Sequence, residues 1–274
     1  MSALMTPADY TALPLVGGDY RIAYGALDDQ FGELFLPESS TGDPAPLAVL
    51  LHGGCWRARF GLAPLGQLAR RLAERGIAVW NVEFRRLDGG GGWPHTFLDV
   101  AAAADFVRTL ADEYPISPER VLAIGHSAGG HLACWLAQRH QLTPDMTLYQ
   151  ENPLPLVGIV SLAGIPDLEK ATDTGICAGA PVELMGGDNT TVPARYREGS
   201  PYAGPPLKIP QWHVVGEDDT LVPASYVEDA VAFAHRRGEV VELITVPAAG
   251  HFEIVSASSP AWPMVEATID AALR

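Results

Sequence analysis

Short apolar runs alternate along this chain with longer stretches whose apolar residues recur every three or four positions. The run Leu47–Leu51 is typical of the first kind, and the stretch 128–139, with Leu132, Trp135 and Leu136 on one face, is typical of the second. Uninterrupted apolar runs indicate strands buried on both sides, and the longer spacing indicates helices that cover them. The predicted strands are 20–24, 32–37, 47–51, 77–82, 120–124, 156–162, 211–215 and 240–246, and the predicted helices are 63–75, 96–111, 128–139, 224–236 and 260–273.

This alternation predicts the α/β class, with a mostly parallel central sheet flanked by helices on both faces. The first two predicted strands have no helix between them, so we expect them to form an antiparallel pair. A single domain over residues 1–274 fits the length. The segment 164–208 is rich in glycine and proline, which interrupt regular structure. We expect it to form a small cap over the site, the alternative being a surface loop without a role.

Ser127 stands at a sharp corner between a predicted strand and a predicted helix, within Gly125-x-Ser127-x-Gly129. Such a corner crowds the backbone, and glycines on both sides relieve the crowding because they have no Cβ. The corner raises the serine hydroxyl above the sheet and turns the N–H of Ala128 toward the same point. The motif is short, so a plain Gly-Ser turn is the alternative interpretation.

A serine hydroxyl becomes a nucleophile only beside a base, and the base needs an acid that orients it. Downstream of Ser127, the predicted strand 211–215 leads into Gly216-Glu217-Asp218-Asp219, and the strand 240–246 leads into Gly250-His251-Phe252. Acid and histidine thus each follow the carboxyl end of a strand, where open α/β sheets build their sites. The order serine, acid, histidine is the one known for such a corner.

The predicted strand 47–51 runs into His52-Gly53-Gly54-Cys55-Trp56. Acyl transfer places negative charge on a carbonyl oxygen, and backbone N–H groups must meet it. Paired glycines allow the close backbone approach that this requires. Trp56 and Phe252 are candidates to flank the pocket with flat apolar surface. The alternatives are a tight turn in place of the anion-binding loop and core packing for both rings.

Taken together, these segments resemble an α/β-hydrolase over nearly the whole chain. His52-Gly53-Gly54-Cys55-Trp56 is similar to the HGGxW pattern of kynurenine formamidase-like and related esterase-like members, a pattern shared with carboxylesterases and acetyl or feruloyl esterases. The register Gly216-x-x-Asp219-x-x-Val222-Pro223 resembles the acid loop of that family and implies Asp219 rather than Asp218. The resemblance implies a triad of Ser127, Asp219 and His251, with an oxyanion hole built by Gly53, Gly54, Cys55 and Ala128.

The function expected from this resemblance is a metal-independent serine hydrolase without a cofactor. Its expected substrate is a small carboxylic ester or an aryl formamide, and arylformamidase acting on N-formylkynurenine is the most specific hypothesis. A non-catalytic ligand-binding module on the same fold is the alternative. The presence of serine, acid, histidine and paired glycines argues against a non-catalytic module, since a protein that does not catalyse a reaction has no need of all four.

Charge and hydropathy limit the classes of partner that we expect this protein to bind. The formal net charge of −15 argues against nucleic acid and anionic membrane surfaces. No apolar stretch reaches the roughly 18 residues of a membrane-spanning helix. The first residues lack a basic and then apolar pattern, so we expect no signal peptide. A small-molecule substrate is therefore the expected partner. A monomer and a homodimer are both compatible with the sequence.

Three cysteines, Cys55, Cys134 and Cys177, are odd in number and widely spaced. This pattern predicts free thiols in a reducing compartment rather than a disulfide framework, hence a cytoplasmic protein. A catalytic Cys55 is a minor alternative, because the order of the surrounding motifs does not pair it with a histidine.

Overall fold

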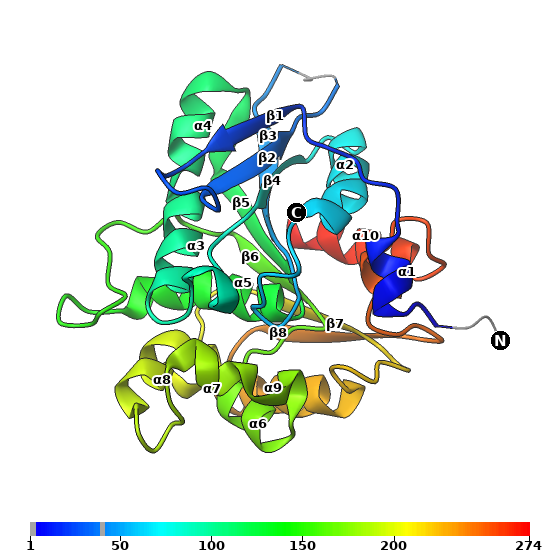
Figure 1. Ribbon diagram of the computed structural model, residues 1–274. Helices are drawn as coiled ribbons and strands as arrows, with labels where there is room; N and C mark the ends of the chain where they lie inside the picture. The colour runs from blue at the N-terminus through cyan, green and yellow to red at the C-terminus, as the bar shows by residue number, and fades with distance from the viewer. Residues whose placement is uncertain (1–3, 39–41) are drawn as a thin grey trace.

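The structure is a computed structural model that describes residues 4–38 and 42–274. Its centre is an eight-stranded sheet of order β1-β2-β4-β3-β5-β6-β7-β8 (Figure 1). The first pairings, β1 with β2 and β2 with β4, are antiparallel, and all others are parallel. The strands are β1 (Tyr20–Ala23), β2 (Phe31–Phe35), β3 (Ala45–Leu51), β4 (Ala78–Val82), β5 (Ile116–His126), β6 (Gly158–Leu162), β7 (Gln211–Gly216) and β8 (Val241–Val246).

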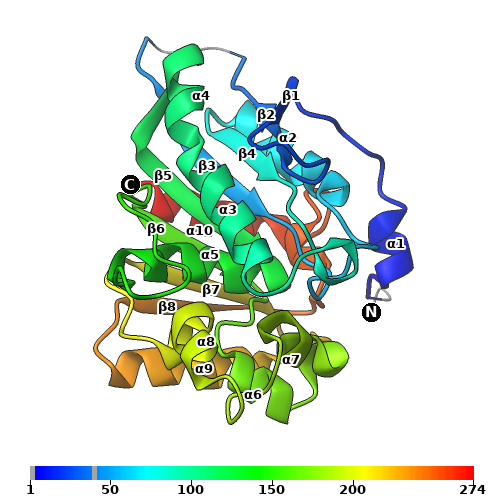
Figure 2. The ribbon, with the colours of Figure 1, turned by 60° about the vertical axis from the view of Figure 1, so that its left-hand side comes forward.

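Helices cover both faces of this sheet, as the alternation predicts. In Figures 1 and 2, α2 and α10 lie on one face, and α3, α4 and α5 lie on the other, while α9 packs beside β7 and β8. The predicted α/β fold is therefore confirmed. These helices are α2 (Gly66–Glu74), α3 (His95–Asp105), α4 (Val107–Glu113), α5 (Ala128–Gln138), α9 (Ala224–Arg236) and α10 (Trp262–Ala272).

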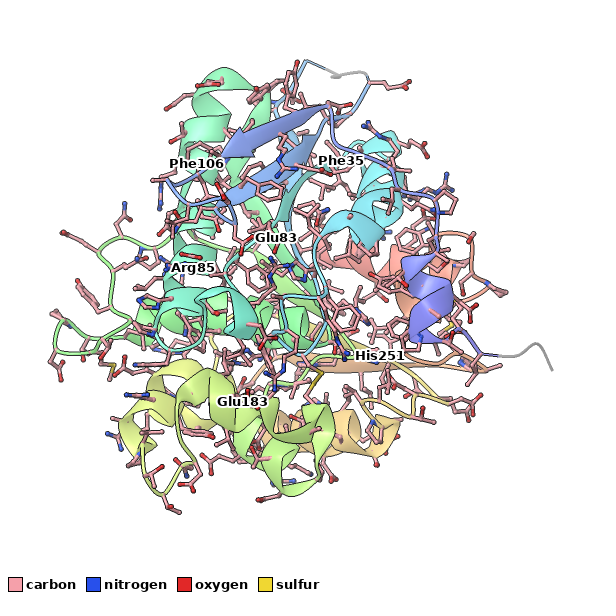
Figure 3. The ribbon with its side chains drawn as sticks, in the orientation of Figure 1. Phe35, Glu83, Arg85, Phe106, Glu183 and His251 are labelled. Atoms are coloured by element: carbon pink, nitrogen blue, oxygen red, sulfur yellow. A yellow bond between two sulfur atoms is a disulfide. The ribbon has the colours of Figure 1, made fainter. Side chains whose placement is uncertain are left out.

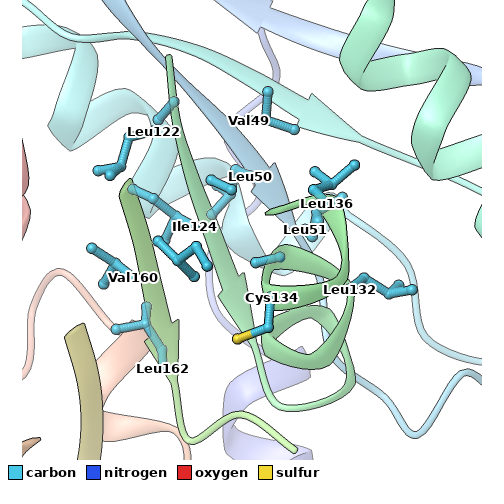
Figure 4. Packing of buried hydrophobic residues seen from close by; sticks show 14 of the residues in the cluster. Val49, Leu50, Leu51, Leu122, Ile124, Leu132, Cys134, Leu136, Val160 and Leu162 are labelled. Carbon is cyan, nitrogen blue, oxygen red and sulfur yellow. The ribbon is translucent and has the colours of Figure 1, made fainter. Parts of the chain in front are cut away.

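The core lies where the central strands meet α5. Leu50 of β3, Ile124 of β5 and Leu132 of α5 are fully buried in one cluster (Figure 4). Because β3 and β5 are covered on both faces, nearly every side chain of their inner halves is apolar, and the alternation of polar and apolar residues is lost. This rigid centre holds the carboxyl ends of β3 and β5, from which two of the candidate site segments emerge.

Several short elements were not predicted. The first element of the described residues is α1 (Pro7–Thr11), and a reciprocal capping box between Thr6 and Asp9 begins this helix. The predicted helix 96–111 is two helices, α3 and α4, separated at Phe106. The segment 164–208 also contains three short α-helices between its glycines and prolines, α6 (Leu168–Asp173), α7 (Ala180–Met185) and α8 (Pro193–Gly199). Each is too short for the periodicity of its apolar residues to show in the sequence.

The carboxyl ends of the parallel strands meet at one edge of the sheet. The helices α6, α7 and α8 of the 164–208 segment lie together at this end of the molecule (Figures 1 and 2). Across the described residues, no helix is both long enough and apolar enough to span a bilayer.

Candidate active site

Ser127 occupies the corner between β5 and α5, and its backbone is strained there, as expected. Its φ of 53° and ψ of −118° lie in a region that side-chain-bearing residues rarely adopt. A Cβ added to Gly125 would lie 2.0 Å from the carbonyl oxygen of Gly129, and one added to Gly129 would lie 2.1 Å from that of Leu51. Only glycine fits at either position, so the local sequence is what allows the corner to form.

His251 and Asp219 come together from the ends of two neighbouring strands. The Nδ1–H of His251, beyond β8, donates to Oδ2 of Asp219, beyond β7, at 2.6 Å. The other carboxylate oxygen accepts the amides of Leu221 at 2.8 Å and Val222 at 2.9 Å. Asp218 is exposed, and its side chain forms no hydrogen bond with the residues that the structure describes. The imidazole is therefore oriented by a carboxylate that is itself fixed, with Nε2 left for another partner.

The Gly53–Cys55 loop lies directly against the serine. A Cβ added to Gly53 would be 3.0 Å from Cβ of Ser127. Among the described residues, the amides of Gly53, Gly54 and Cys55 meet no hydrogen-bond acceptor. Ala128 opens α5, and a first helical residue has no acceptor for its amide within its own helix. The structure thus brings unused N–H donors to the neighbourhood of one hydroxyl group.

Ser127 and His251 line one cavity of about 520 Å³. Figure 3 shows His251 at the same end of the sheet as α7, the helix that carries Glu183. The 164–208 segment contributes Gly175–Ala178 to the wall, so it covers part of this cavity. A hydroxyl, an oriented imidazole and free amides around one half-open cavity form a set that can carry out acyl transfer.

The two aromatic candidates lie in different places. Phe252 lines the cavity and stacks on Tyr10 of α1, with ring centroids 4.8 Å apart. The expectation that Trp56 flanks the pocket is wrong, because its ring turns inward, is 1% exposed and packs edge-on against His131. Tyr10, which the sequence did not single out, takes the place of the second aromatic wall.

Comparison with known proteins identifies the family of this chain. The model of the BD-FAE family matches residues 33–231, more than half of the chain. The chain belongs to the BD-FAE family.

Individual relatives of this BD-FAE protein are named as esterases. Esterase LipC of Mycobacterium tuberculosis is 27% identical over 249 residues, which cover 84% of this chain and 59% of LipC. A probable isoprenylcysteine alpha-carbonyl methylesterase, ICMEL1 of Arabidopsis thaliana, is 33% identical over 113 residues, or 41% of this chain and 23% of that protein. The chain therefore spans less than two thirds of either relative.

Solved structures share the fold of this BD-FAE protein. Esterase B of Lactobacillus rhamnosis, inhibited by a tributyrin phosphonate, superposes with a TM-score of 0.80 at 19% identity, covering 97% of this chain and 90% of that one. A truncated carbohydrate esterase from gut microbiota superposes with a TM-score of 0.76 at 20% identity, covering 98% and 99%. At such identity the likeness establishes the α/β-hydrolase fold.

Sequence reasoning missed a buried hydrogen-bonded pair, His52 and Glu83, that holds the Gly53–Cys55 loop of this BD-FAE protein. His52 Nε2 lies 2.9 Å from Glu83 Oε1, and Nδ1 lies 2.8 Å from the carbonyl oxygen of Gly53. Burial alone would raise the pKa of Glu83, but His52 and Arg86 outweigh it and lower the pKa of the carboxyl. Glu83 directly follows β4, so an acid just past a strand end was the available signal.

His126 and His131 flank Ser127 in sequence and serve as buried hydrogen-bond donors. His126 Nε2–H donates to the carbonyl oxygen of His251 at 3.0 Å, and His131 Nε2–H donates to that of Gly199 at 2.7 Å. Burial lowers the pKa of His131 to about 4, and burial followed by repulsion from His251 lowers the pKa of His126 well below its usual value. Both imidazoles are therefore neutral at neutral pH, and His126 fixes the backbone of the histidine loop.

The expectation that all three cysteines are free thiols is wrong. Cys55 and Cys177, 122 residues apart, form a disulfide, and Cys134 is a free and buried thiol. The 164–208 segment brings the two Cα atoms to 5.5 Å, which is within bonding range, and no spacing rule could show this contact. The bond ties that segment to the Gly53–Cys55 loop at the cavity wall. Disulfides are rare in cytosolic proteins, so the cysteines no longer support a reducing compartment.

Removing this bond is expected to lower the free energy of unfolding by about 2–5 kcal/mol, because the cross-link restricts a long loop of the unfolded chain. Urea unfolding of the wild type with and without a thiol reductant measures the loss, and Cys177→Ser should match the reduced wild type. Cys177→Ser itself should not respond to the reductant. Equal midpoints for the wild type in both conditions, with three thiols titrated after reduction, would refute this stabilising role.

Proposed function

We propose that this protein is a serine hydrolase of the carboxylesterase type. The observation that carries the proposal is that one cavity joins Ser127 to His251, whose imidazole is held by Asp219 at 2.6 Å. The esterase names of its relatives support the same reaction class. The alternative, a binding module without catalysis, does not account for the strained backbone of Ser127 or for the imidazole of His251 held by Asp219.

In the proposed mechanism, Ser127 Oγ attacks the substrate carbonyl and passes its proton to Nε2 of His251. Nε2 is the acceptor because Nδ1 already carries the proton shared with Asp219. The amides of Ala128 and of Gly53–Cys55 stabilise the oxyanion. His251 then protonates the leaving group, and a water molecule activated by the same imidazole releases the acyl group. No metal or cofactor takes part in these steps.

The proposed substrates are small carboxylic esters. The cavity of about 520 Å³ is in the range of pockets for small molecules, and the 164–208 segment forms part of its wall. The stacked rings of Tyr10 and Phe252 favour a flat group on the substrate. This aromatic wall is the observation in favour of a second candidate reaction, the hydrolysis of aryl formamides such as N-formylkynurenine.

Specificity for acyl length tests this proposal. We expect kcat/KM for p-nitrophenyl esters to be highest between acetate and butyrate and to fall steadily toward palmitate, because a cavity of about 520 Å³ suits a short acyl chain and the 164–208 segment covers part of it. The series is measured beside N-formylkynurenine, in the presence and absence of EDTA. A maximum at twelve carbons or beyond would overturn the small-acyl proposal, and complete inhibition by EDTA, reversed by zinc, would replace the serine mechanism. The absence of turnover on every ester and on the formamide would favour the binding module.

A further inference from the structure

The cavity wall carries positive charge in a strongly acidic protein. The whole chain has 33 acidic and 18 basic residues, counting Asp, Glu, Lys and Arg. Within the described part of the chain, however, the residues that line the cavity include Arg57 and Arg59 and neither an aspartate nor a glutamate. Asp219 stands behind His251 rather than in the wall. The wall itself therefore carries arginines and no carboxylates, although the molecule as a whole is acidic.

The two arginines of this wall differ in their partners. Arg57 donates to both carboxylate oxygens of Glu183 on α7, each at 2.7 Å, so its charge is already compensated. Arg59 is exposed and has no carboxylate within ion-pair distance among the residues that the structure describes. A guanidinium group with an open edge offers a carboxylate two parallel hydrogen bonds. Among the described residues of the cavity wall, Arg59 is thus the arginine without a carboxylate partner.

The position of Arg59 is defined by the ring beside it. Its guanidinium carbon lies 4.8 Å from the centroid of Phe60, a contact that orients the cation over the ring and leaves its edge free. Phe60 in turn packs on the Gly53–Cys55 loop, since a Cβ added to Gly54 would lie 2.4 Å from Cβ of Phe60. The side chain therefore stands one aromatic ring away from the loop that faces Ser127, in the wall of the same cavity.

We propose that Arg59 binds a carboxylate group of the substrate, so that the cavity selects esters bearing an anionic group. This inference rests on the proposed ester hydrolysis and names its substrate class. The carboxylate can belong to the acyl part or to the leaving group, and both place a negative charge beside the same guanidinium. None of the described residues that line the cavity is acidic, so no carboxylate of the wall competes with the substrate for Arg59.

Two pairs of esters test the proposal. The 4-nitrophenyl monoester of adipic acid is compared with 4-nitrophenyl hexanoate for an anion on the acyl side. For an anion on the leaving group, 4-acetoxybenzoate is compared with its methyl ester. Each pair is measured with the wild type, with Arg59→Gln and with Arg236→Gln. Arg236 is a matched control, because it is exposed, lies over the ring of Phe233 and is outside the cavity.

We expect Arg59→Gln to lower kcat/KM for at least one charged ester about tenfold, as for one charge-assisted contact in a half-open site. The loss should appear in KM. The neutral partner should change less than about twofold, and Arg236→Gln should resemble the wild type. Added salt should weaken the wild-type preference for the charged ester and leave the variant unaffected. The pair that responds shows which side of the ester carries the carboxylate.

Equal losses on charged and neutral esters, or no loss on either charged ester, would overturn the role of Arg59. A separate measurement keeps this result distinct from a failure of the proposed hydrolysis. Calorimetry on Ser127→Ala, with and without Arg59→Gln, compares the 4-acetylbenzoate anion with neutral 4-acetylbenzamide, neither of which is an ester. Weaker binding of the anion alone in the double variant supports the anion site even if no ester is cleaved. Equal binding in both backgrounds contradicts it.

Discussion

Ser127→Ala is expected to lower kcat for small esters by about 10⁴-fold or more while leaving the fold intact. The hydroxyl stands on a backbone corner of φ 53° and ψ −118°, against the amides of the Gly53–Cys55 loop and in one cavity with His251. Alanine keeps the Cβ, so the packing at the corner is preserved and only the proposed nucleophile is lost. Steady-state kinetics and the urea midpoint of the same preparation give the two readouts.

Thr220→Ala is the control for this prediction. Thr220 is an exposed hydroxyl residue in the wall of the same cavity, and the proposed mechanism does not use it. Thr220→Ala should lower kcat by less than about tenfold, which is far less than the loss expected when a triad residue is removed. A folded Ser127→Ala protein that keeps a tenth of the wild-type activity would end the assignment of the nucleophile.

Asp219→Asn is expected to lower kcat by about 10³- to 10⁴-fold, the range known when a triad carboxylate becomes an amide. One oxygen of Asp219 accepts the amides of Leu221 and Val222, so the amide oxygen of asparagine should keep that position. Its NH₂ group would then face Nδ1 of His251 and force the ring proton to Nε2. An imidazole protonated at Nε2 cannot accept the proton of the serine.

Asp218→Asn is the matched control for the second prediction, since its carboxylate is the neighbouring one in sequence and is exposed. We expect a change of less than tenfold, because its amide rather than its side chain makes a contact, with the carbonyl oxygen of Ala249 at 2.9 Å. The pair is compared by kcat at saturating ester. Equal losses, or a greater loss for Asp218→Asn, would show that the register of the acid loop was assigned to the wrong carboxylate.

The sheet could be predicted from the sequence because its central strands are buried on both faces. Such strands read as apolar runs with clear ends, and β3 through β7 were all found within a few residues of their observed bounds. The partly exposed edge strand β8 was found as well. The helices of the 164–208 segment could not be found, since each spans less than two turns and begins and ends at local caps. The break between α3 and α4 at Phe106 carries no glycine or proline that would have signalled it.

The candidate site was predictable to the extent that strand order determines it. Ser127, Asp219 and His251 each follow a parallel strand, and parallel strands bring their carboxyl ends to one edge. Contacts between loops follow no such rule. The Cys55–Cys177 bond depends on how the 164–208 segment folds back, and the inward turn of Trp56 depends on the packing of α5. Neither can be predicted from the local sequence.

Labelling with a fluorophosphonate tests the central claim most directly, because only an activated serine takes up such a probe. The intact protein is treated with the probe, digested, and the modified peptide is located by mass spectrometry. The account predicts a single adduct on Ser127 that is absent in Ser127→Ala, forms much more slowly in Asp219→Asn and forms at the wild-type rate in Asp218→Asn. No adduct on the folded wild type, or an adduct on another residue that Ser127→Ala retains, would contradict it.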